Sequence, residues 1–186
     1  MRLKNTIVLL TVSLMFLCGN AFAESPMDEA DGYKLALPGV EKYDKQSYKL
    51  LKSEVGEINK TLGVVAFEEG EEIVFTVGTD GDQVKGVLLS LTENGKMGLI
   101  EVMVSMEVNP VKVLKVLIIS TQESRGRGII RKEFRDQYIG KSLKDPLLIN
   151  EDIKGVTRAT TSSWAVNRAV KKSLLLVEDV YNKRAH

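Results

Sequence analysis

Four short apolar runs between residues 73 and 119 constrain the fold of this chain more than any other feature. They read IVFTV (73–77), VKGVLLSL (84–91), LIEVMV (99–104) and VKVLKVLII (111–119), and are rich in the β-branched residues typical of strands. Turn-forming residues separate them: GTDG at 78–81, Asn94-Gly95, and Asn109-Pro110. This spacing predicts a twisted antiparallel sheet that is at least half buried.

Helical periodicity flanks these runs on both sides. Residues 45–62 place four apolar side chains on one face, with Gly63 as the expected C-cap: Leu51, Val55, Ile58 and Leu62. From Ser163 onward a second apolar stripe has helical spacing: Val166, Val170, Leu174, Val177 and Tyr181. A short helix is also expected over residues 130–138, followed by a loop over 140–155. Helices packed on an antiparallel sheet make α+β the predicted fold class.

The first 23 residues have the layout of a secretory signal peptide. Arg2 and Lys4 give a basic start, residues 7–18 are almost unbroken apolar, and Ala21-Phe22-Ala23 offers small residues for cleavage. The apolar run is about a dozen residues long, against the ~20 that cross a bilayer. We therefore expect cleavage after Ala23 and a periplasmic or otherwise extracytoplasmic location. An uncleaved membrane anchor and a lipid on Cys18 are the weaker alternatives.

The 163 residues that follow suit one domain with its own core. Residues 24–42 are polar and small, with prolines and glycines, and predict a flexible leader. Residues 43–97 are expected to supply the N-terminal helix and strands, and residues 98–186 the ligand-binding core. We expect 43–186 to form a single domain.

The composition after residue 23 excludes several classes of function. Residues 1–23 hold two of the 26 basic residues and none of the 25 acidic ones, which leaves 24 basic against 25 acidic. The basic excess that nucleic-acid binding requires is therefore missing. No cysteine remains, and the single histidine is His186, the last residue. Thiol, iron–sulfur, His-zinc and Ser-His-Asp chemistry lack their residues, so chemistry must come from a bound cofactor or not at all.

Residues 155–170, GVTRATTSSWAVNRAV, are the most informative about function. Four consecutive hydroxyl residues, 160–163, precede the predicted C-terminal helix, and Ser163 is the expected N-cap. A helix N-terminus presents unpaired N–H groups and a positive dipole end, which hold a phosphate without a lysine. This pattern alone leaves two interpretations open, a phosphate site and simple helix capping.

The same segment resembles the flavin-attachment motif of the FMN-binding domain family, which includes the C subunit of the sodium-pumping NADH:quinone reductase and the G subunit of the Rnf complex. Residues 157–160, Thr-Arg-Ala-Thr, occupy the positions of the family's Ser/Thr-Gly-Ala-Thr quartet. The resemblance implies that Thr160 forms a phosphoester with FMN, a bond that a separate flavin transferase makes. The neighbours expected to bind the cofactor are Thr157, Arg158, Ala159, Thr161 and Ser162.

The upstream half of the family pattern is present as well. Glu123-Ser124-Arg125-Gly126 and Gly128 follow the predicted strand 111–119, and Gly140-Lys141 precedes the attachment motif. Between them lie Phe134, Gln137 and Tyr138, which match the family's aromatic helix. The resemblance covers about residues 98–175, and it places Glu123 near the flavin ring and Gly126 in the cofactor loop.

Two positions depart from the family pattern. Lys154 stands where the family has an aspartate, and the nearest acid is Asp152. Arg158 replaces the glycine of the quartet. A planar guanidinium suits a phosphate or a flavin oxygen, whereas a bulky side chain opposes the tight turn that glycine allows.

The resemblance implies an exported electron-transfer protein that carries FMN. Its expected partners are the flavin transferase and a redox donor and acceptor, membrane-bound proteins included, and no nucleic acid. Two alternatives stay open: a module that binds FMN or another phosphorylated ligand without a covalent bond, and an accessory subunit whose flavin site has lapsed. Trp164 is a further candidate for packing on the flavin ring, although a lone tryptophan is more often part of a core.

Overall fold

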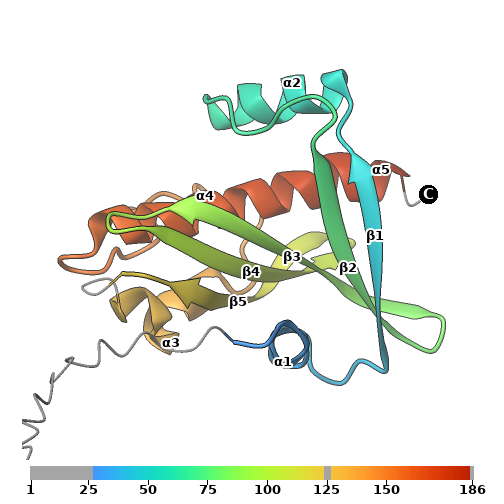
Figure 1. The fold of residues 1–186 in the computed structure, drawn as a ribbon, viewed down its shortest axis with the longest axis horizontal. Coiled ribbons are helices and arrows are strands. Elements are labelled where there is room, and N and C mark those ends of the chain that lie inside the picture. The colour runs from blue at the N-terminus through green and yellow to red at the C-terminus, as the bar shows by residue number, and fades with distance from the viewer. Residues whose placement is uncertain (1–26, 124–126, 185–186) are drawn as a thin grey trace, which may run out of the picture.

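The computed structural model describes residues 27–123 and 127–184 (Figure 1). In chain order the elements are α1 (Glu29–Ala36), β1 (Lys42–Lys49), α2 (Lys52–Leu62), β2 (Glu72–Asp80), β3 (Gln83–Asn94), β4 (Leu99–Val108), β5 (Val111–Thr121), η1 (Arg127–Ile130), α3 (Lys132–Arg135), η2 (Asp136–Tyr138), α4 (Thr160–Leu176), the π-helical turn η3 (Val177–Tyr181) and α5 (Asn182–Arg184). The predicted signal peptide, residues 1–23, lies outside the described residues, as do Gly126 and His186.

The five strands form one antiparallel sheet in the order β1-β2-β3-β4-β5, so every strand pairs with its neighbours in the sequence. This confirms the predicted α+β class. β2 and β3 pair only between the Thr76–Leu88 pair and their shared turn. Beyond that point the two strands separate, and β2 continues with β1 while β3 continues with β4 (Figure 1).

Helix α4 lies along one face of the sheet and supplies much of the core (Figure 1). The predicted apolar stripe is confirmed, because Val166, Val170, Leu174 and Val177 are all completely buried. These side chains pack against sheet residues such as Val102. Burial of one such side chain contributes about 1.5–3 kcal/mol, so this helix is firmly fixed on the sheet.

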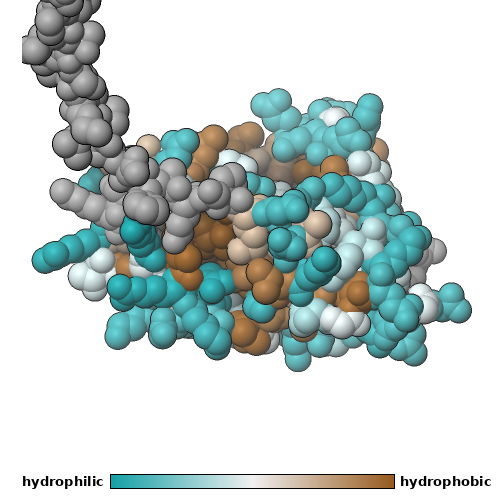
Figure 2. Space-filling model, turned by 60° about the horizontal axis from the view of Figure 1, so that its bottom comes forward, coloured by the Kyte–Doolittle hydropathy of each residue, from teal (hydrophilic) through white to brown (hydrophobic). Residues whose placement is uncertain are grey.

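Helix α1 covers the opposite face, where we expected a flexible leader. Ala36 and Leu37 are buried against Leu88, Met103 and Leu117. Figure 2 brings this face forward and shows apolar side chains near its middle with hydrophilic ones around them. The expectation was wrong for this segment because its few apolar residues gain burial from the sheet, which local composition does not reveal.

The first strand is a second correction. Residues 45–49 belong to β1, which pairs with β2 along its whole length, and the helix predicted for 45–62 begins only at Lys52. Leu51 precedes that helix and is 56% exposed, whereas Ile58 is fully buried. The predicted C-cap is confirmed, since Gly63 has a φ of 70° and donates its N–H to Asn59 O (2.9 Å).

Neither described stretch, 27–123 nor 127–184, holds a helix with the length and apolar character needed to cross a bilayer.

Candidate functional site

The N-cap of helix α4 lies four residues earlier than predicted. Ala159 is the N-cap and Thr160 is the first helical residue. Ser163, the expected N-cap, lies inside the first turn and is completely buried. Its Oγ donates to Ala159 O (2.9 Å) and accepts the N–H of Val156 (3.0 Å). The Ser163 hydroxyl therefore connects the preceding loop to the first turn of the helix.

The start of α4 has the properties of an anion site. The backbone bond from Ser163 N to Ala159 O (2.9 Å) is the first one of the helix. The N–H groups of Thr160, Thr161 and Ser162 therefore have no acceptor within the helix. They point out of the positive end of a helix of 17 residues. The side chains of Thr160 and Thr161 are exposed and add two hydroxyl groups.

Arg158 approaches this helix in a strained conformation. Its φ is +67°, the left-handed region that glycine occupies freely and an L-residue with a long side chain avoids. The residue is exposed. The glycine of the family motif thus corresponds to a real turn, and this chain makes the same turn with an arginine.

A cavity of about 1030 Å³ lies over the start of α4. Its lining residues are Lys96, Met97, Glu123, Thr157, Arg158, Ala159, Thr160, Thr161 and Ser162. Seven of the eight residues predicted from the sequence therefore meet in one place, and the eighth, Gly126, lies outside the described residues. Their contacts with FMN stay predictions. Trp164 is 39% exposed and does not line this cavity.

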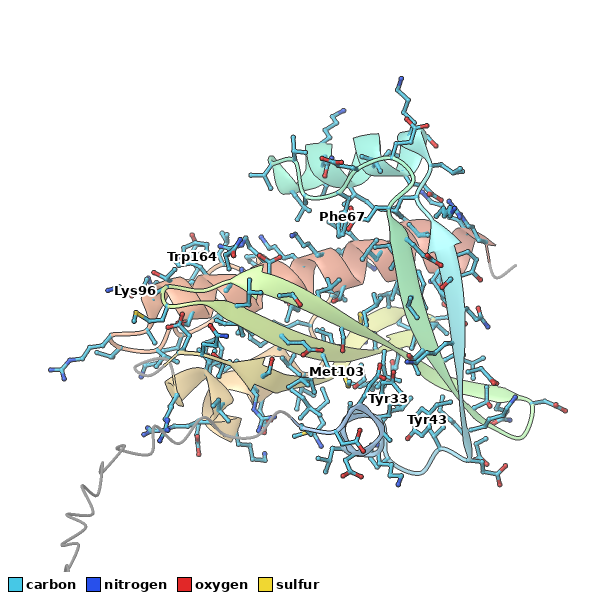
Figure 3. All side chains as sticks on the ribbon, in the orientation of Figure 1. Tyr33, Tyr43, Phe67, Lys96, Met103 and Trp164 are labelled. Atoms are coloured by element: carbon cyan, nitrogen blue, oxygen red, sulfur yellow. The ribbon has the colours of Figure 1, made fainter. Side chains whose placement is uncertain are left out.

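Sequence reasoning missed Lys96 and Met97. Both lie in the turn between β3 and β4, at the same end of the molecule as the start of α4, and Figure 3 marks Lys96 at this turn. The available signal was a lysine between the two glycines of a hairpin turn. That signal shows exposure but not which distant segment the turn faces.

Glu123 enters the cavity from the end of β5 but is only 5% exposed. One of its carboxylate oxygens accepts the N–H of Met97 at 2.6 Å, and its own N–H donates to Thr121 Oγ1 (3.1 Å). The carboxylate thus has a backbone partner in the facing turn.

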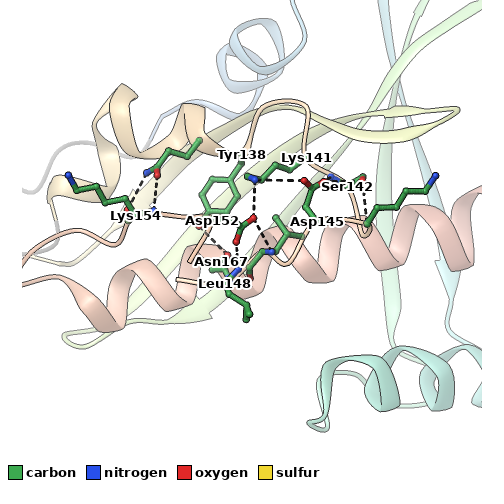
Figure 4. A network of polar contacts seen from close by, with 11 residues as sticks. Tyr138, Lys141, Ser142, Asp145, Leu148, Asp152, Lys154 and Asn167 are labelled. Atoms are coloured by element: carbon green, nitrogen blue, oxygen red, sulfur yellow. Dashed lines mark hydrogen bonds and ion pairs between the residues drawn. The ribbon is translucent and has the colours of Figure 1, made fainter. Parts of the chain in front are cut away.

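The loop between η2 and α4 is organised around Asp152 (Figure 4). Its carboxylate accepts the N–H groups of Leu148 (2.7 Å) and Leu147 (3.2 Å), and Lys141 Nζ lies 2.9 Å away. Burial raises the pKa of Asp152, but these backbone and Lys141 hydrogen bonds together bring it below the ordinary value. The carboxylate of Asp152 is therefore bonded to Lys141 and to the loop backbone, so it does not replace the missing motif aspartate.

Lys154 occupies the aspartate position with its side chain exposed. The Gln137 side chain fixes its backbone, because Gln137 Oε1 accepts Lys154 N–H (2.8 Å) and Gln137 Nε2 donates to Lys154 O (3.2 Å). This pair explains the glutamine in the predicted helix segment, because its side chain holds the loop at Lys154 (Figure 4).

Tyr138 and Asn167 anchor the same loop to α4. Asn167 Nδ2 donates to Leu147 O (2.8 Å), and Tyr138 Oη lies 3.4 Å from Asn167 Oδ1. Both residues are buried, and burial raises the pKa of Tyr138 far above its ordinary value. The Tyr138 hydroxyl is therefore protonated at neutral pH, and the loop that leads to the attachment motif is held by Tyr138 and Asn167.

The strained backbone of Arg158 leads to a stability prediction. Arg158→Gly is expected to raise the free energy of unfolding by about 1 kcal/mol, because glycine adopts the left-handed region without the steric cost of a Cβ. Urea denaturation followed by circular dichroism measures it. Asn150→Gly is the matched control, since Asn150 has a φ of +72° but asparagine tolerates it, and little change is expected. A destabilised Arg158→Gly protein would contradict the strain.

The cavity suits a phosphorylated ligand with an apolar body. Three unpaired N–H groups and the Thr160 and Thr161 hydroxyls converge on one end. Lys96 and Arg158 add positive charge, and Met97 offers an apolar side chain that is 62% exposed. A mononucleotide flavin has both properties, a phosphate at one end and a large apolar ring at the other.

Comparison with known proteins agrees with this geometry. Residues 95–175 match the family model of the FMN-binding domain. The match extends from the β3–β4 turn to the penultimate residue of α4, so it contains every described residue that lines the cavity. No curated protein matches the chain. The chain therefore carries a domain of the FMN-binding domain family, and FMN is the cofactor of that domain.

Proposed function

We propose that this chain is an exported electron-transfer protein whose FMN is attached to Thr160 through a phosphoester. An FMN-binding domain supports flavin binding and electron transfer in general terms. The bound flavin supplies one- and two-electron chemistry, and the protein supplies its position and environment. The observation that carries the finer proposal is the position of Thr160, the first residue of α4, exposed in the cavity at the attachment position of the motif.

The surroundings of Thr160 support the proposed phosphoester. In the proposed reaction the Thr160 hydroxyl loses its proton, and its oxygen bonds to the FMN phosphorus of FAD. The pyrophosphate bond of FAD breaks and AMP leaves, so no oxidant or reductant takes part. The N–H groups of Thr161 and Ser162 are free to bind the phosphate oxygens, and Arg158 and Lys96 offset the remaining negative charge.

A covalent bond is physically useful for an exported protein. Outside the cytoplasm a released FMN is diluted away, whereas an ester makes retention independent of the free ligand concentration. The signal-peptide pattern of residues 1–23 supports export. The donor and the acceptor would meet the flavin at the open side of the cavity, where Met97 is exposed.

A non-covalent FMN module is the second candidate, and Lys154 is the observation that favours it. The structure has an exposed lysine at the motif's acidic position, and the carboxylate of Asp152 is bonded to the loop backbone. If the transferase requires a carboxylate at that position, the cavity holds FMN by its N–H groups and cations alone.

Intact mass spectrometry separates these candidates. We expect the full chain, produced in an exporting host together with a flavin transferase, to gain the mass of one FMN less water on the peptide that contains Thr160. A yellow native protein with an unmodified mass would favour the non-covalent module. A colourless protein with an unmodified mass would contradict both and favour a lapsed site.

A further inference from the structure

The turn between β3 and β4, residues 95–98, packs tightly on the end of β5. Gly95 donates its N–H to Gly98 O at 2.8 Å, which closes the turn. A Cβ on Gly95 would collide with Glu123 Oε1, and a Cβ on Gly98 would collide with Gln122 Oε1. Neither position has room for a Cβ unless one of these neighbouring side chains moves, so the turn lies close against the end of β5.

Two charged side chains fix this turn from different elements. From α4, Arg168 donates to Asn94 O (3.1 Å) and to Glu93 Oε2 (3.0 Å) at the base of the turn. From the end of β5, Glu123 accepts the N–H of Met97 (2.6 Å) at its tip. Lys96 lies between these two attachment points, so its backbone is held on both sides while its side chain is exposed at the cavity.

The charges of the two residues suggest different roles. A carboxylate repels a phosphate, and that of Glu123 is almost fully buried with a backbone N–H as its partner. An ammonium attracts a phosphate, and Lys96 has no acidic partner among the ion pairs of the described residues. The cavity thus holds two exposed cations, Lys96 and Arg158, and one anion, Glu123, which holds the turn that bears Lys96.

We propose that Lys96 binds the FMN phosphate and that Glu123 is a positioning residue, which acts by holding the β3–β4 turn. This inference rests on the proposed function, because it takes FMN as the ligand. It assigns to Glu123 an indirect role in place of a contact with the flavin ring. It also adds Lys96, from outside the attachment motif, as a source of positive charge in the cavity besides Arg158.

The test is a double-mutant cycle measured by FMN fluorescence titration of protein made without the transferase. Lys96→Gln is expected to weaken FMN binding about tenfold, the effect of one charged hydrogen bond. Glu123→Ala is expected to weaken it by a similar factor, since the turn is released. Because Glu123 acts through Lys96, the double variant should bind no more weakly than Lys96→Gln. Multiplicative losses in the double variant would overturn the indirect role.

Two conservative changes guard against simple misfolding. Glu123→Gln keeps an oxygen for the Met97 N–H and should retain most of the affinity, whereas a flavin contact that needs the charge would be lost. Gly95→Ala keeps the carboxylate group, but the added Cβ would meet Glu123 Oε1 and separate Glu123 from the turn, so this variant should behave like Glu123→Ala. Lost affinity in Glu123→Gln together with full affinity in Gly95→Ala would overturn the positioning role. Thermal unfolding of each variant shows that the fold is intact.

Riboflavin, which lacks the phosphate, provides the ligand control. Lys96→Gln should leave riboflavin binding unchanged, and Lys112→Gln, an exposed lysine of β5, should leave both ligands unaffected. Equal losses for FMN and riboflavin would overturn the assignment of Lys96 to the phosphate. If the unaltered protein binds no FMN and also gains no FMN mass with the transferase, the proposed function itself fails. If it binds FMN and Lys96→Gln does not change the affinity, only this inference fails.

Discussion

Thr160→Val is expected to carry no covalently bound flavin after co-expression with a flavin transferase. Valine has nearly the shape of threonine but no hydroxyl, so the ester oxygen is missing while the helix start is retained. Thr160 is exposed at the first position of α4, where such a change alters stability by no more than about 0.5 kcal/mol. The measurement is intact mass together with flavin fluorescence of the denatured protein.

Thr157→Val and Thr161→Val are the matched controls for this experiment. Both threonines line the same cavity and are exposed, so each variant removes one hydroxyl from the same surroundings. We expect both to keep most of their covalent flavin, because neither occupies the attachment position. Covalent flavin that persists in Thr160→Val, or disappears only in Thr161→Val, would place the ester elsewhere.

Asp152→Ala is expected to lower the free energy of unfolding by about 3 kcal/mol at neutral pH. The change removes the acceptor for Leu147 and Leu148 N–H and the ionic partner of Lys141, and hydrogen bonds to a charged group contribute about 1.5–3 kcal/mol each. Urea denaturation measures the difference. Glu151→Ala is the control, because the side chain of this exposed neighbour makes no hydrogen bond or ion pair within the described residues. An equal effect of both variants would contradict the role of Asp152.

The pH dependence of this difference follows from the lowered pKa of Asp152. A carboxyl whose pKa is lower in the folded state stabilises the protein above its unfolded pKa, and this stabilisation is lost as the pH falls toward the folded value. The ordinary value is 3.8, so the difference between the native protein and Asp152→Ala should be complete at pH 7 and shrink below about pH 4. A difference that stays constant down to pH 2 would show that the charge is irrelevant.

The consequence for the site lies in the loop that Asp152 organises. Asn167 holds Leu147 O from α4, and Ser163 holds Val156 N, so the chain from 147 to 156 is fixed at both ends. Arg158 then makes its left-handed turn into the helix. Because the attachment motif follows directly from this loop, loss of Asp152 is expected to disturb Thr160 without any contact between them.

Local sequence patterns determined the four strands β2 to β5, the buried stripe of α4 and the presence of a hydroxyl-rich helix start. These features depend on periodicity and on turn residues such as Asn94-Gly95, which act within a few positions of the chain. The family resemblance then indicated the residues around Thr160, and the cavity collects all of those that the structure describes.

Only the tertiary structure decided the remaining features. Helix α1 is stable because its few apolar residues reach the second face of the sheet, and β1 forms because β2 offers it a complete pairing partner. Lys96 belongs to the cavity because Glu123 and Arg168, 27 and 72 positions later in the chain, hold its turn above α4. Each of these outcomes depends on contacts between distant segments, and local propensity carries no information about such contacts.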